Sequence, residues 1–154
     1  MELKDFKKDY SKYIEKYKLP KFEELNEDFE IDKLEKDTDY LLRAIRKLMM
    51  EKIVNSVNFL EMLLNPVNMP RMYLPYIKTM SMEDKQVIDS LYDSLAKLTL
   101  ISLDLEIGFS EDGEAELIKK IFSEWRVLKP DFKKIISGIN NPRAAVKRER
   151  SYFG

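Results

Sequence analysis

Apolar residues recur at spacings of three and four over long stretches of this sequence, and this spacing constrains the fold more than any other feature. The pattern covers residues 40–64, returns over 82–107, and returns again over 111–129. Such spacing places apolar side chains along one face of a helix, so we predict three long helices in these ranges. The first would be about 40 Å long at the ~1.5 Å rise per residue of an α-helix. No stretch shows the alternation that is typical of a strand.

The residues at the ends of these ranges support the prediction. Ser81 followed by Asp84 resembles a capping box that would begin the second long helix. Gly108 is suited to follow its end. Ser110 precedes a run of acidic residues, which are favourable in the first turn of a helix. Asn65-Pro66 is expected to end the first long helix, because the residue before a proline is biased away from the helical region.

The remaining segments add shorter elements. Residues 3–17 are amphipathic at helical spacing, and Pro20 follows them. Residues 22–39 are strongly acidic, and a short helix or an irregular arm would both suit them. Pro130 either restarts a helix or kinks one, and the apolar face continues to Gly138. We therefore expect an all-α, antiparallel, up-and-down bundle of four to five helices in one domain, residues 1–140, and a basic tail, 141–154, that could be flexible.

Composition narrows the possible chemistry. The 154 residues include no cysteine and no histidine, which excludes disulfides, cysteine nucleophiles, Ser–His triads and the usual zinc sites. Basic and acidic residues nearly cancel at 27 against 28, so no overall field favours nucleic acid. The N-terminus lacks the apolar core of a signal peptide, and no apolar run could span a membrane. From these observations we expect a soluble, cytoplasmic protein.

Charge is arranged in blocks. Net charge is positive over residues 1–21, negative over 22–39, positive over 40–81, negative over 82–117 and positive over 118–154. Sequence neighbours in a bundle are usually neighbours in space, so this alternation would place opposite charges across helix interfaces. Chance together with solvated faces would explain the pattern equally well.

The acidic segment contains a candidate magnesium site formed by Glu23, Glu24 and Glu27. Glu24-x-x-Glu27 resembles half of the carboxylate motif of all-helical nucleotide pyrophosphohydrolases, which implies a Mg²⁺-dependent enzyme. The second half is missing, because Glu51 and Glu61 have no aspartate three residues later. A solvated acidic surface is the alternative. Under any other interpretation we expect no cofactor.

A second acidic group lies on the second long helix. Asp89, Asp93, Lys97 and Asp104 would lie on one stripe of that helix. The spacing could serve a metal, but it also describes an outward face with an Asp93–Lys97 ion pair. We favour the outward face.

The C-terminal tail is a candidate for binding nucleic acid. It has aromatic residues at Tyr152 and Phe153 that could stack on bases. It could equally dock on an acidic surface of its own protein. Its candidate contacts are Arg143, Lys147, Arg148 and Arg150.

Residues 65–82, NPVNMPRMYLPYIKTMSM, are unusually apolar for a connection and contain three prolines. We call them the proline–methionine segment. They would either close one end of the bundle or expose a patch for a partner, since methionine suits adaptable surfaces. The candidate partner-binding residues are Met69, Arg71, Met72, Tyr73 and Tyr76.

The stretch NPVNMPRMYLPYIKTMSMEDKQ is the most distinctive part of the chain. With the histidine- and cysteine-free helical composition around it, it resembles small uncharacterised helical-bundle proteins of thermophilic archaea. The resemblance implies a fold but identifies no particular activity. Our best hypothesis for the function is a non-catalytic interaction or assembly protein that forms a homodimer or another homo-oligomer, and we assign no catalytic residues. The alternatives are the Mg²⁺-dependent hydrolase and a nucleic-acid accessory protein that uses the tail.

Overall fold

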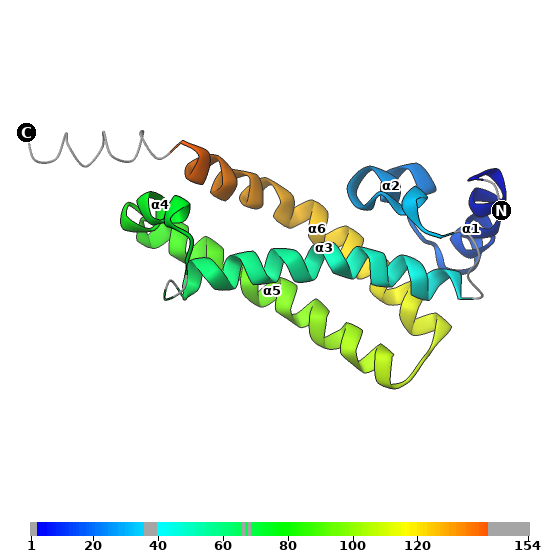
Figure 1. Ribbon diagram of the computed structural model, residues 1–154. Coiled ribbons are helices and arrows are strands. Elements are labelled where there is room, and N and C mark those ends of the chain that lie inside the picture. Colours follow the sequence, from blue (N-terminus) through cyan, green and yellow to red (C-terminus); the bar gives the residue numbers. More distant parts are fainter. Residues whose placement is uncertain (1–2, 36–39, 66, 68, 142–154) are drawn as a thin grey trace, which may run out of the picture.

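The computed structural model describes residues 3–35, 40–65, 67 and 69–141, and this part of the chain forms six α-helices and no strand (Figure 1). The prediction of an all-α fold is confirmed. Six helices are present where four to five were expected, because the acidic segment and the proline–methionine segment each contain a short helix. The helices are α1 (Leu3–Tyr17), α2 (Phe22–Phe29), α3 (Leu41–Leu64), α4 (Leu74–Lys78), α5 (Met82–Ile107) and α6 (Glu111–Asn140).

The three long helices α3, α5 and α6 pack against one another and form the body of the molecule. In Figure 1, α1 and α2 lie near the N-terminal end of α3, and α4 lies near its C-terminal end. Each long helix contributes one apolar stripe to a single core, as the spacing predicts. Residues of the core without solvent exposure include Ile45, Met49, Ile53, Leu60, Ile88, Leu95, Leu98, Ile118 and Ile121.

The observed ends of α3 and α5 agree with the predicted ranges, and the capping box at the start of α5 is confirmed. Ser81 Oγ accepts a hydrogen bond from Asp84 N at 3.1 Å, and Asp84 Oδ2 accepts one from Ser81 N at 3.3 Å. Ser110 likewise caps α6, where its Oγ accepts from Gly113 N at 3.1 Å. Gly108 follows α5 in an extended conformation, with φ of −131°, so it is not the left-handed cap that glycine commonly supplies.

The predicted end of α6 near residue 129 is wrong. The helix continues through Pro130 to Asn140. A proline inside a helix removes one backbone hydrogen bond and crowds the preceding turn, at a cost of ~3 kcal/mol. Packing beyond the proline offsets that cost, because Phe132 and Ile135 are both buried.

The N-terminal helices form a small aromatic cluster at one end of the body. Phe22 packs edge-on against Phe6, with 5.4 Å between ring centroids. The Tyr10 hydroxyl donates to the Pro20 carbonyl at 2.6 Å, which holds the connection between α1 and α2 against α1. These contacts give the tyrosine-rich face of α1 a packing role.

A buried carboxylate fixes α2 on the body. Asp28 accepts a hydrogen bond from Lys129 Nζ on α6 at 2.7 Å, and its backbone carbonyl accepts one from Lys52 Nζ on α3. The Lys52 ammonium also lies 5.1 Å from the centroid of the Trp125 ring. Burial lowers the pKa of Lys52, and the nearby Asp28 carboxylate opposes that shift.

The part of the chain that the structure describes has no helix with the length and apolar character needed to cross a bilayer.

Candidate functional site

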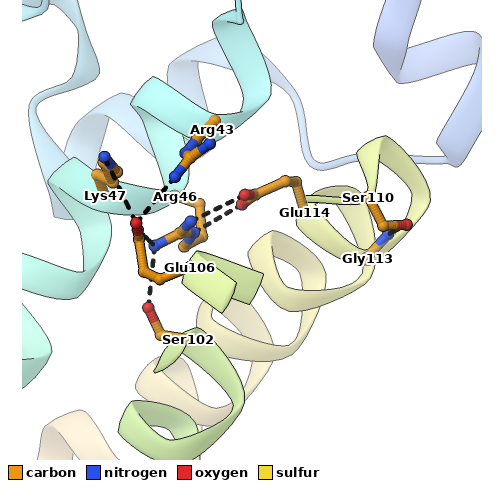
Figure 2. A network of polar contacts seen from close by, with 8 residues as sticks. All are labelled: Arg43, Arg46, Lys47, Ser102, Glu106, Ser110, Gly113 and Glu114. Atoms are coloured by element: carbon orange, nitrogen blue, oxygen red, sulfur yellow. Dashed lines mark hydrogen bonds and ion pairs between the residues drawn. The ribbon is translucent and has the colours of Figure 1, made fainter. Parts of the chain in front are cut away.

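The most buried polar group of the described residues is a charge network that joins the three long helices (Figure 2). Arg46 of α3 is 1% exposed, and Glu114 of α6 is fully buried. Arg46 Nε donates to Glu114 Oε2 at 2.6 Å, and Arg46 Nη2 donates to Glu114 Oε1 at 2.8 Å. This two-pronged arrangement matches a planar guanidinium to a planar carboxylate and is among the stronger ion-pair geometries.

The third nitrogen of the same guanidinium binds α5. Arg46 Nη1 donates to Ser102 Oγ at 3.0 Å and to Glu106 Oε1 at 2.7 Å. Arg43 Nη2 donates to Glu106 Oε2 at 2.9 Å, so Glu106 bridges two arginines of α3. Lys47 Nζ lies 3.7 Å from the same oxygen, and its side chain is half exposed. One arginine thus contacts α5 and α6 together.

Local structure at the start of α6 brings Glu114 to Arg46. The Ser110 cap fixes the first turn of α6, as Figure 2 shows. A side chain at Gly113 would place its Cβ 2.6 Å from Leu105 Cδ2, so glycine allows this turn to approach α5 closely. Glu114 is the next residue after Gly113, and its side chain is buried on the side of α6 that faces Arg46.

Hydrogen bonding in the network shifts the pKa of two groups in opposite directions. The bonds to Arg46 and then to Arg43 lower the pKa of Glu106 to about 2. The bonds to Glu114 raise the pKa of Arg46 above its usual value, and burial opposes this. Both groups are therefore charged at neutral pH.

The bonding within the network fits a structural role, in which Arg46 and Glu114 hold helices together. The three guanidinium nitrogens of Arg46 and both oxygens of Glu114 make hydrogen bonds within the protein. A general base or a substrate-binding arginine needs a free side that faces a ligand. We therefore assign Arg46 and Glu114 to holding the helices in register.

Our sequence predictions missed this network, although the sequence contains a signal for it. Arg46 directly follows Ile45 on the face that also carries Met49, and Glu114 lies three and four residues before Leu117 and Ile118. A charge inside an apolar stripe indicates either a partner or a boundary of the stripe. Which cation pairs with which anion depends on contacts between residues 68 apart in the chain, which spacing does not reveal.

The proline–methionine segment has an inward side. Tyr76 is buried, and its burial raises the pKa of its hydroxyl to about 12. A Cβ added at Gly138 of α6 would lie 2.8 Å from Tyr76 Cε2, so the ring lies directly on that glycine. Tyr73 packs edge-on against Phe59 of α3, with 5.9 Å between centroids. These contacts close the end of the core.

The same segment also has an outward side. Met69 is half-buried, whereas Arg71 and Met72 are exposed. Leu74 and Met82 are exposed as well. Of the candidate partner-binding residues, the structure therefore places Tyr76 in the core and leaves Arg71 and Met72 accessible.

The candidate magnesium residues have separate surroundings. Glu23 lies 3.7 Å from Lys7 Nζ, and Glu24 Oε2 accepts a hydrogen bond from Lys21 N at 3.3 Å at the start of α2. Glu27 is exposed. Nowhere in the described ranges do three or more acidic side chains group closely enough to hold a metal ion.

The polar stripe of α5 faces outward. Asp89, Asp93, Lys97 and Asp104 are all exposed. Asp93 and Lys97, both of them described, form no ion pair with each other, so that expected contact is absent. The tail candidates Arg143, Lys147, Arg148 and Arg150 lie outside the described residues.

A further surface, which our predictions did not include, lies on the C-terminal half of α5. Leu100, Leu103 and Ile107 are exposed to 66%, 55% and 88%. Large apolar side chains grouped on one exposed face are typical of interaction surfaces. The apolar spacing over 82–107 predicted a helix and left these residues unassigned, because spacing does not show which of two apolar faces packs inward.

In comparisons with family models, curated proteins and solved structures, nothing matches this chain.

Proposed function

We propose that this chain is a non-catalytic interaction or assembly protein, a helical bundle that associates with copies of itself. The observation that supports this proposal best is the group of exposed leucine and isoleucine side chains on α5. Leaving such side chains in water forgoes ~1.5–3 kcal/mol each relative to burial, and a partner surface would recover it. The outward side of the proline–methionine segment adds a second, smaller apolar surface.

The polar groups of the chain also fit a non-catalytic role. The buried charges of Arg46 and Glu114 satisfy each other, and Asp28 is held by Lys129. Each of these groups links helices. This favours a rigid scaffold that presents its surfaces to a partner.

We also infer an antiparallel, up-and-down arrangement of the three long helices. The connection between Ile107 and Glu111 is short, and short connections favour antiparallel neighbours. Packing between α3 and α6 in this arrangement would hold α5 in place and leave its exposed face accessible to a partner.

The oligomeric state in solution tests the proposal. Sedimentation velocity and light scattering of the full chain over a wide concentration range should give a homodimer or another discrete small oligomer. A protein that stays monomeric throughout that range would refute self-association.

A further inference from the structure

The exposed face of α5 has the spacing of a coiled-coil seam. Ala96, Leu100, Leu103 and Ile107 follow one another at intervals of four, three and four residues. These are the intervals of the apolar positions in a heptad repeat, which mesh with the same positions of a second helix. Ala96 is half-buried, and the other three are exposed, so no other described residue fills this seam.

The charges beside the seam can form ion pairs between two copies of α5 when the two helices are antiparallel. Lys97 and Asp104 are seven residues apart and so occupy the same flank of α5. Both are exposed, and neither forms an ion pair with another of the described residues. When two copies of one helix pair antiparallel, equal flanks meet, and Lys97 then lies near the partner's Asp104. In a parallel pair, opposite flanks of the two helices meet, so neither Lys97 nor Asp104 would gain an oppositely charged neighbour.

We propose that two copies of this chain pair antiparallel through α5. In this register Leu100 of one copy packs beside the partner's Leu103, and Ala96 packs beside the partner's Ile107. The two Lys97–Asp104 pairs then form symmetrically, as a two-fold axis requires. This inference rests on the proposed self-association and names the surface and the orientation that produce it.

The surroundings of the seam suit a second copy. On the flank of Asp104 a groove of about 630 Å³ lies between α5 and α6. Its apolar lining is Ile101, Leu105 and Leu117, and its charged lining includes Asp104, Glu116, Lys119 and Lys120. Side chains of a partner helix could enter this groove and extend the contact beyond the seam. One short seam is smaller than the ~800 Å² per partner of a standard interface, so the dimer should be reversible and depend on concentration.

Substitution at the centre of the seam tests the surface. Leu103→Glu should raise the dissociation constant on the order of a hundredfold or more, because both copies lose a buried leucine and gain a charge. Val127→Glu is the matched control, since Val127 is 74% exposed on α6 and should leave the oligomer unchanged. Circular dichroism checks that both variants keep their helix content. An oligomer that Leu103→Glu leaves intact would overturn the inference but not self-association, whereas a monomeric wild-type chain would overturn both.

Charge reversal tests the orientation. Lys97→Asp and Asp104→Lys should each weaken the dimer on the order of tenfold, because each change places like charges together in two symmetric pairs. The double variant should return to near the wild-type dissociation constant. Single variants that bind as tightly as wild type, or a double variant weaker than both, would overturn the antiparallel register.

Disulfide cross-linking gives an independent test. No native cysteine can form a competing link, since the chain has none. Mild oxidation of a mixture of the Ala96→Cys and Ile107→Cys variants should link one to the other, while each variant alone should stay largely unlinked. Linking of each variant to itself would indicate parallel pairing and overturn the inference, and so would the absence of any link at concentrations where the dimer is present.

Discussion

Removing the Arg46 side chain should destabilise the protein severely, and the structure indicates by how much. In Arg46→Met the buried Glu114 carboxylate loses the donors that now lie 2.6 and 2.8 Å from its two oxygens. Glu114 has no exposed surface through which water could replace them. Breaking a buried ion pair by removing one partner costs ~3–5 kcal/mol, against a total stability of ~5–15 kcal/mol for a typical domain.

Urea denaturation measures this loss directly. Unfolding can be followed by far-ultraviolet circular dichroism and by the fluorescence of Trp125, the single tryptophan. With a urea dependence of ~1–3 kcal/mol per molar, a loss of ~3–5 kcal/mol should lower the midpoint by about 1–5 M. The slope should stay unchanged, since the same surface is exposed on unfolding.

Two variants make the result interpretable. Lys47→Met removes a cation that also lies near Glu106 but is half exposed, so it should change stability by less than ~0.5 kcal/mol. Arg46→Met combined with Glu114→Leu replaces both charges with apolar groups and should recover most of the loss. A single Arg46→Met variant as stable as wild type would refute the reasoning, and so would a double variant no more stable than the single one.

Three further predictions concern stability. Pro130→Ala should stabilise the protein by ~1–3 kcal/mol in urea denaturation, because Pro130 is exposed inside α6 and alanine restores the missing N–H; a loss of stability would contradict this. Gly138→Ala should destabilise it by ~1–3 kcal/mol, because the Tyr76 ring must move, and the same change on a Tyr76→Leu background should be neutral or stabilising. Because the folded pKa of Glu106 is lowered to about 2, its stabilisation is present above the ordinary glutamate value and is lost as pH falls from there toward 2. In urea titrations at a series of pH values, Glu106→Gln should reduce the pH dependence in that window, and an unchanged profile would contradict the assignment.

The sequence predicts the long helices well because their ends depend on local chemistry. Ser81 and Ser110 cap their helices through hydrogen bonds to backbone N–H groups three residues away, which a single sequence displays. At Pro130 the local sequence leaves two outcomes open, a restarted helix or a continuous one with a kink. The local preference against helix at that position is overcome by burial of Phe132 and Ile135 against other elements, and that burial depends on tertiary packing.

Ion pairs between distant segments follow the signs of the charge blocks, although not only between blocks that are neighbours in sequence. The ion pairs that join distant segments connect blocks of opposite sign, such as Lys7 with Glu23, Lys129 with Asp28 and Arg46 with Glu106. The sign of a block could be read from the sequence. The individual partners could not, because each block offers several cations or anions and only the packed structure brings particular ones together.

The C-terminal half of α5 could present either of two apolar faces to the core, and this relates the buried network to the exposed seam. The C-terminal half of that helix has apolar residues on opposite sides, with Leu98 and Leu105 buried and Leu100, Leu103 and Ile107 exposed. Taken alone, this half of α5 could therefore pack with either face inward, whereas the outward-facing Asp89 and Asp93 of the other half already favour the observed rotation. Ser102 and Glu106 both bind Arg46, and only one rotation brings both of them to it. Buried ionic groups can select one packing among several at some expense in stability. In this chain the bonds of Arg46 favour the rotation that leaves Leu100, Leu103 and Ile107 facing solvent, and this is the surface that we propose pairs with a second copy.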